Sequence, residues 1–144
     1  MLTSSPLLVS SFYVSAPQHC PAGVEDFINA VAGLIPEINE TPFSLLKKLQ
    51  EIESEAARKR SGVQNEARTL DLDLITFQDY VCNDEKLILP HPRAHERRFV
   101  LEPLVEISGD WAFPGAENTT KELLSLNKEQ GLEILAENSA YLNP

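Results

Sequence analysis

The sequence predicts an α+β domain of ferredoxin-like type, in which helices pack on a β-sheet. Two apolar, strand-like runs come first, a strongly helical segment follows, and a segment with alternating side chains comes after it. A strand–helix–strand succession implies a crossover connection and a parallel pair of strands. The chain has 144 residues, of which 42% are hydrophobic. Because this size suits one packed core, we expect a single domain over residues 1–144.

The first two strands are expected at Leu7–Val14 and Phe27–Leu34. The first run, LLVSSFYV, is rich in residues that favour strands, and the segment PQHCPAG at 17–23 interrupts the chain after it. The second run ends before Pro36. We therefore interpret the two runs as neighbouring strands.

The third element is a helix that begins after Thr41. Thr41 offers a side-chain oxygen as N-cap, and Pro42 suits the first helical position. Apolar residues follow at helical spacing, at Leu45, Leu49, Ile52 and Ala56. Residues 58–68 lack this periodicity, so we expect an exposed loop there.

A strand is expected next, over Thr69–Phe77, because its side chains alternate with period two. One face of this strand would carry Leu70, Leu72 and Leu74, and the other Asp71, Asp73 and Ile75.

Two helices are expected in the remainder of the chain. Arg97–Leu101 predicts a short helix that Pro103 stops. Thr119 and Glu122 have the spacing of a capping box, which predicts a last helix over 120–127.

The net charge of −10 is unevenly distributed. The flanks are acidic, whereas residues 47–98 are balanced and hold every arginine of the chain. An acidic chain argues against duplex nucleic acid and anionic membranes as partners, and a local arginine cluster favours a small anionic ligand. No secretory signal or membrane-length apolar run is seen, and the two cysteines are too few for a disulfide scaffold, so we expect a cytoplasmic protein with reduced thiols.

Asp71 and Asp73 are the main candidates for chemistry. Two carboxylates on one face of a strand, about 6.5–7 Å apart at Cα, suit Mg²⁺ ions that also bind phosphate oxygens. Arg58, Arg60 and Arg68 precede them, and guanidinium groups bind phosphate oxygens in pairs. Two structural alternatives remain open: a solvent-exposed polar sheet face for the aspartates, and a helix-end interaction for Arg58. Since no phosphate-binding glycine motif occurs, side chains would have to hold a nucleotide.

Six ordered blocks of the sequence resemble the 6-hydroxymethyl-7,8-dihydropterin pyrophosphokinase family of folate biosynthesis. The blocks are SSFY at 10–13, FINAV at 27–31, LKKLQEIE at 46–53, RTLDLDLI at 68–75, LPHPR at 89–93 and RRFVLEPL at 97–104. The resemblance implies transfer of pyrophosphate from ATP to the hydroxymethyl group of a reduced pterin, with release of AMP.

The resemblance also implies roles for individual residues. Asp71 and Asp73 would hold two Mg²⁺ ions, with Arg58 and Arg68 as catalytic arginines. ATP would be bound by Gln50, Glu53, Arg60, Lys86, Ile88, His91 and Arg97. The pterin would contact Ser15, Phe27, Asn29 and Phe99. From the residues alone, Phe99 is better interpreted as a core aromatic, and Asn29 as a strand-end amide that satisfies backbone groups.

Members of this family open with a strand and a helix that we expect to be absent from this chain. A homo-oligomer or a partner would then complete the sheet. A non-catalytic remnant that keeps the fold, and with it nucleotide binding, is therefore the alternative function. A weaker alternative is a nucleotide-sugar transferase that binds metal through the Asp71–Leu72–Asp73 triplet.

Overall fold

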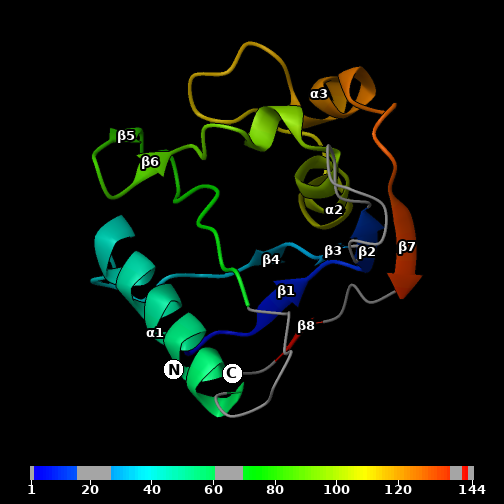
Figure 1. Cartoon of the computed structure of the whole chain (residues 1–144). Coiled ribbons are helices and arrows are strands. Elements are labelled where there is room, and N and C mark those ends of the chain that lie inside the picture. Colours follow the sequence, from blue (N-terminus) through cyan, green and yellow to red (C-terminus); the bar gives the residue numbers. More distant parts are fainter. Residues whose placement is uncertain (1, 16–26, 61–69, 137–140, 143–144) are drawn as a thin grey trace.

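The computed structural model describes residues 2–15, 27–60, 70–136 and 141–142, and it has the predicted α+β character (Figure 1). Its helices are α1 (Pro42–Arg60), α2 (Arg98–Ser108) and α3 (Thr120–Leu126), with a 3₁₀ turn, η1 (Ala94–Glu96). Its strands are β1 (Leu7–Val9), β2 (Phe12–Ser15), β3 (Phe27–Asn29), β4 (Ala32–Gly33), β5 (Cys82–Asn83), β6 (Ile88–Leu89), β7 (Glu133–Ala136) and β8 (Tyr141–Leu142). No helix in the described part of the chain is long and apolar enough to cross a membrane.

The first two predicted runs do lie side by side, but a β-bulge divides each into two short strands. Val9 lies opposite Ala32, whereas Tyr13 lies opposite Asn29, so the first run has one residue more between these pairs. Ser10 occupies the bulge: its N–H donates to the carbonyl of Val31, and its Oγ accepts from the N–H of Val31. The bulge fixes which side chains of β2 and β3 share a face.

Every strand pair in the described ranges is antiparallel. β7 pairs with β2 and β8 with β1, and neither strand is predicted from the sequence. The short hairpin β5–β6 stands apart from these sheets. The parallel pair expected from the crossover is therefore not found among the described residues.

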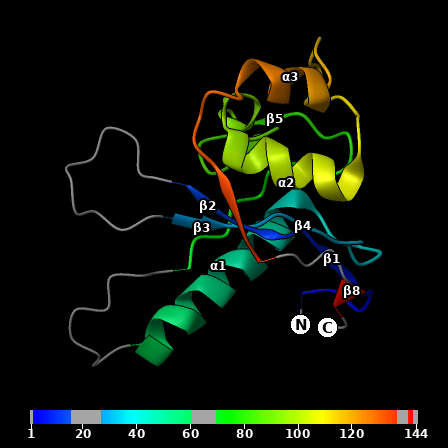
Figure 2. The ribbon, with the colours of Figure 1, turned by 90° about the vertical axis from the view of Figure 1, so that its right-hand side faces the viewer.

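Helix α1 begins as predicted but continues further. The N–H of Ser44 donates to Oγ1 of Thr41, which caps the helix. The helix extends to Arg60, so the exposed loop expected from residue 58 was placed too early; residues 61–69 lie outside the described residues. Leu45 and Leu49 are buried, whereas Ile52 is 37% exposed, and Figure 2 shows the second half of α1 extending away from the strands.

The strand predicted over Thr69–Phe77 is wrong for residues 70–77. This segment is not assigned as a strand, because its backbone groups bond elsewhere: the N–H of Leu72 donates to Oε2 of Glu53, and the carbonyl of Ile75 accepts from the N–H of His91. The alternation persists without the pairing only over 71–74, since Leu70 is exposed. Leu72 and Leu74 are half-buried, whereas Asp71 and Asp73 are exposed.

Helix α2 is longer than predicted, since Pro103 lies inside it rather than ending it. Proline has no N–H to donate to the carbonyl of Phe99, but its ring is fully buried, and this apolar packing offsets the lost bond. The helix ends instead at Gly109, whose φ of +70° suits glycine and whose N–H donates to the carbonyl of Val105.

Helix α3 has the predicted start and the predicted capping box. The N–H of Glu122 donates to Oγ1 of Thr119, and the N–H of Thr119 donates to Oε1 of Glu122. Local chemistry alone determines this end of the helix, which is why the sequence reveals it.

Two apolar clusters hold these elements together. One gathers around α2 and α3 and includes Leu101, Leu104, Phe113 and Leu123. The other joins α1 to the β5–β6 hairpin through Leu45, Phe77, Leu87 and Leu89. Figure 1 shows α1 apart from α2 and α3, so the expected layer of helices on one sheet is only partly realised: α2 packs against β2, and α1 packs chiefly against the segment 74–89.

Candidate active site

The predicted pterin-binding residues of the sheet share one face. Tyr13 lies opposite Asn29, and Ser15 lies opposite Phe27, so these four side chains point to the same side of β2 and β3. Nδ2 of Asn29 donates to Oγ of Ser15 at 3.0 Å, which orients the amide. Phe27 is 56% exposed. This face therefore offers a polar pair beside an exposed aromatic ring.

The carboxylate of Glu106 joins this face to α2. It accepts from the N–H and Oγ of Ser11, at 3.0 and 2.7 Å to Oε2, and from the hydroxyl of Tyr13, at 2.8 Å to Oε1. Burial, and then this hydrogen bond to Glu106, raise the pKa of Tyr13 far above its ordinary value. Tyr13 therefore acts as a neutral donor that orients the sheet against the helix.

Arg97 and Phe99 lie at the start of α2. The guanidinium carbon of Arg97 lies 5.5 Å from the centre of the Phe99 ring, within the range of a cation–π interaction. Phe99 is half-buried and packs against the α2–α3 cluster. It is thus partly the core aromatic of the structural alternative, with the remainder of its surface accessible.

His91 connects the α2 side to the aspartate segment. The backbone N–H of His91 donates to the carbonyl of Ile75 at 2.8 Å, and its ring nitrogen Nδ1 accepts from the backbone N–H of Arg93 at 3.2 Å. Burial lowers the pKa of His91, the charge of Asp73 opposes this shift, and Arg97 and Arg93 reinforce it. His91, Asp73 and Arg97 are therefore close enough for their charges to interact.

The aspartate pair is exposed and available. Neither Asp71 nor Asp73 has a hydrogen bond or an ion pair with another described residue, and Glu53 orients the backbone between them through its bond to Leu72. Groups of three or more residues that could hold a metal ion are not found within the described ranges. A cation bound here would accordingly need ligands from its substrate as well.

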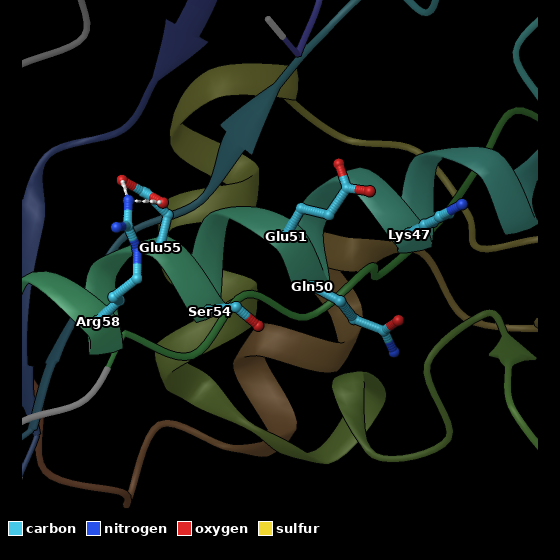
Figure 3. Close-up of a pocket in the computed structure, with 6 residues that line it drawn as sticks. All are labelled: Lys47, Gln50, Glu51, Ser54, Glu55 and Arg58. Carbon is cyan, nitrogen blue, oxygen red and sulfur yellow. Dashed lines mark hydrogen bonds and ion pairs between the residues drawn. The ribbon is translucent and has the colours of Figure 1, made fainter.

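Two of the predicted residues of α1, Gln50 and Arg58, line an open groove of about 440 Å³, whereas Glu53 is not among its lining residues and bonds to the N–H of Leu72 instead. Figure 3 shows Gln50 and Arg58 among the lining residues on the exposed part of the helix. Nη2 of Arg58 pairs with Oε1 of Glu55 at 2.6 Å, on a side chain that is 74% exposed. An exposed pair of this kind contributes little to stability, so a bound phosphate could compete for Arg58.

The remaining predicted residues are not brought to the aspartates by the described structure. Lys86 and Ile88 lie on the exposed β5–β6 hairpin. The backbone of Arg60 ends α1, and its side chain lies outside the description, as does all of Arg68.

The chain matches the model of the family described as 7,8-dihydro-6-hydroxymethylpterin-pyrophosphokinase (HPPK) over residues 2–109. It belongs to the HPPK family.

Curated relatives agree with this assignment. The chain is 40% identical over 112 residues to the 2-amino-4-hydroxy-6-hydroxymethyldihydropteridine pyrophosphokinase of Haemophilus influenzae, covering 78% of this chain and 68% of the relative. The enzyme of the same name from Bacillus subtilis is 43% identical, covering 69% of this chain and 57% of the relative. The Pseudomonas aeruginosa enzyme is 37% identical, covering 88% and 75%. The chain thus spans between about half and three quarters of these HPPK proteins.

All of the predicted site residues lie inside the stretch that matches the HPPK family. Two residues that sequence reasoning missed make notable contacts: Glu106, which is inside it, and Gln130, which is outside it. Neither has a local sequence signature, because their partners lie about 30 to 95 positions away along the chain. Only the folded arrangement reveals them.

Proposed function

We propose that the chain transfers the pyrophosphoryl group of ATP to 6-hydroxymethyl-7,8-dihydropterin and releases AMP. The observation that carries this proposal is the HPPK family match over residues 2–109, which contains every candidate site residue. The same residues include two exposed carboxylates, an arginine and a histidine whose charges interact, and a sheet face with an aromatic ring and an amide. These suit a charged triphosphate on one side and a flat polar ring on the other.

The chemistry is an in-line displacement. The hydroxymethyl oxygen attacks the β-phosphorus of ATP, the bond from that phosphorus to the bridging α–β oxygen breaks, and AMP leaves with the electron pair. The hydroxyl proton passes to solvent or to a nearby carboxylate such as Asp73. Arg97 and Arg58 would stabilise the negative charge on the phosphate oxygens, as Arg68 would from its position in the sequence.

Asp71 and Asp73 fit Mg²⁺ because they are hard oxygen ligands with no competing partner among the described residues. Since the described residues form no group of three metal ligands, the two carboxylates would hold the two expected ions together with ATP phosphates. Bound there, Mg²⁺ would neutralise phosphate charge during transfer. Gln50, Glu53, Arg60, Lys86, Ile88 and His91 would line the nucleotide site under this proposal.

The pterin is proposed to stack on Phe99 or Phe27, with Asn29 and Ser15 as hydrogen-bonding groups. The Ser15–Asn29 bond supports this because it leaves the amide oxygen of Asn29 oriented and free to accept. The edge of a pterin ring carries hydrogen-bond donors and acceptors, which bind best to protein groups whose orientation is fixed.

The proposal also covers the location of the protein, its domain extent and its substrates. We place the protein in the cytoplasm, as a transferase of folate biosynthesis with one domain over residues 1–144 and small-molecule substrates. Completion of its sheet by a second copy or by another partner stays a prediction.

One observation favours a second candidate, a non-catalytic relative that keeps the fold and nucleotide binding. The segment 70–77, which carries both aspartates, pairs with no strand among the described residues. Without such pairing, the carboxylates are held by fewer contacts than a catalytic metal site ordinarily has.

The test is to mix the purified chain with ATP, Mg²⁺ and the pterin and to separate the nucleotides by chromatography. We expect AMP to form only when both Mg²⁺ and the pterin are present. A folded chain that binds ATP but makes no AMP would support the second candidate. A folded chain that does neither would contradict both.

A further inference from the structure

Arg97 occupies a position in the fold that arginine does not ordinarily fill. It is the N-cap residue of α2, with extended backbone angles of φ −116° and ψ 111°, and its side chain makes no capping hydrogen bond. N-cap positions favour Ser, Thr, Asp and Asn because their side-chain oxygens accept from the first free N–H groups of the helix. A guanidinium has only donors and cannot do this.

The side-chain amide of Gln130 supplies the missing cap. Its Oε1 accepts from the N–H of Arg98 at 2.9 Å, and its Nε2 donates to the carbonyl of Glu96 at 2.8 Å. One amide therefore satisfies the backbone groups on both sides of Arg97. The second N–H of the amide donates to Oδ1 of Asn127 at 3.1 Å, which fixes the orientation of the amide.

The turn that carries Gln130 is itself fastened to α2. Nη1 of Arg98 donates to the carbonyls of Lys128 and Gln130, at 3.0 and 2.8 Å, and its Nη2 donates to Oε1 of Glu102 at 3.1 Å. Nδ2 of Asn127 donates to the carbonyl of His95 at 3.2 Å. Five hydrogen bonds thus join the segments 127–130 and 95–98, so the amide is held where it meets the backbone of Arg97.

This arrangement leaves the side chain of Arg97 available for another task. It extends over the ring of Phe99, 5.5 Å from the ring centre, and its charge acts on His91. Because Gln130 caps α2, the N-cap position can be occupied by Arg97 instead of a residue with a short acceptor side chain.

We propose that Gln130 is a positioning residue, which holds the backbone around Arg97 so that the guanidinium lies over the Phe99 ring and faces the ATP phosphates. This inference rests on the proposed function, because it takes Arg97 as an ATP-binding residue. It extends the site beyond residues 2–109, where the family match ends.

The first experiment compares Gln130→Ala with Glu129→Ala in the complete chain. Glu129 is the exposed neighbour of Gln130, and its side chain has no interaction within the described structure, so its loss should leave both Michaelis constants unchanged. Loss of the three side-chain bonds of Gln130, two of which hold the backbone beside Arg97, should raise KM for ATP, and Kd for a non-hydrolysable ATP analogue, about fivefold. KM for the pterin should change less than about twofold, since Ser15 and Asn29 are unaffected.

A purely structural cap would give a different pattern. Gln130→Ala would then unfold at lower temperature and bind the ATP analogue like the parent chain, which would overturn the proposal. The variant Gln130→Glu keeps the acceptor for Arg98 but loses the donors to Glu96 and Asn127 and turns a carboxylate oxygen toward the Glu96 carbonyl, so it should bind the analogue no better than Gln130→Ala.

A double-mutant cycle identifies the route of the effect. If Gln130 acts through Arg97, Gln130→Ala should change nucleotide affinity little in an Arg97→Ala background. An equal fivefold loss in both backgrounds would overturn the proposal. A parent chain that neither turns over nor binds the ATP analogue would instead overturn the proposed function, and this inference with it.

Discussion

The candidate pterin side and the candidate phosphate side of the molecule are built differently. On the pterin side, the protein's own polar contacts orient the groups: Asn29 bonds to Ser15, and Glu106 joins β2 to α2 through Tyr13. On the phosphate side, Asp71 and Asp73 are exposed and bond to no described side chain. The pterin side is thus organised by the fold, and we infer that the aspartate pair of the phosphate side is completed by the charged substrate and its cations.

The side-chain packing also differs between two regions of the molecule, the α2–α3 cluster and the second half of α1. The cluster around α2 and α3 contains the fully buried Leu101. The second half of α1, which carries Arg58, is largely exposed and extends away from the strands, as Figure 2 shows. An exposed surface suits a polyanion, because charge attracts the polyanion before contact. An uncharged ring has no such attraction and depends on the packed surface that it meets.

The largest expected effect is on the phosphate side. Asp73→Ala should lower kcat for AMP formation about 100-fold or more, because a carboxylate ligand of the cations is lost. Asp79→Ala is the matched control, since Asp79 is an exposed aspartate on the turn after Phe77. Turnover by Asp73→Ala at the parental rate would remove the metal role from this residue and end the distinction between the two sides.

A smaller effect, on stability, sharpens the contrast in packing. Leu101→Ala should lower the free energy of unfolding by about 3 kcal/mol, because it removes a fully buried side chain from the α2–α3 cluster. Ile52→Ala should cost less than about 1 kcal/mol, since Ile52 is 37% exposed on α1. Urea unfolding at pH 7 measures both, and equal losses would contradict the description of two differently packed regions.

The smallest expected effect concerns the anchored end of α1. Hydrogen bonds from Lys48, at 2.6 Å, and from Ser44 lower the pKa of Glu40 below its ordinary value of 4.5. The folded state therefore binds a proton at Glu40 less readily than the unfolded state does. The resulting stability is fully present above about pH 4.5 and is lost as the pH falls through the lower folded pKa.

Thermal unfolding between pH 7 and pH 3.5 tests this effect. The melting temperature of Glu40→Gln should fall less steeply below pH 4.5 than that of the parent. Glu129→Gln, at an exposed glutamate, should follow the parent curve. If Glu40→Gln also follows the parent curve, Glu40 does not anchor the helix in this way.

The elements predicted correctly are those with a local cause. Thr41 and the Thr119–Glu122 box cap their helices through neighbours three positions away, so the sequence is sufficient. Pro103 misled the prediction because burial of its ring in the core outweighs the hydrogen bond that it cannot make. Alternation correctly separated exposed aspartates from half-buried leucines over 71–74, but Leu70 is exposed, and alternation does not reveal whether a neighbouring strand is present.

The candidate site shows the same difference between residues that a motif reveals and contacts between distant segments. The family resemblance implied Asp73, His91 and Arg97 as site residues, and the fold brings them close enough for their charges to interact, while their roles stay predictions. The sequence could not predict that Gln130 caps the helix at Arg97 or that Glu106 orients Tyr13, because each contact joins distant segments. Such contacts depend on tertiary packing and leave no periodic or local trace.

Phosphorus NMR of the complete reaction tests the central claim most directly. The chain, incubated with Mg²⁺, ATP and 6-hydroxymethyl-7,8-dihydropterin, should produce AMP and the pterin diphosphate in equal amounts, because attack at the β-phosphorus moves two phosphates together. Formation of ADP with a pterin monophosphate, or of ADP with inorganic phosphate, would contradict it. So would a folded chain that leaves ATP unchanged in the presence of the pterin.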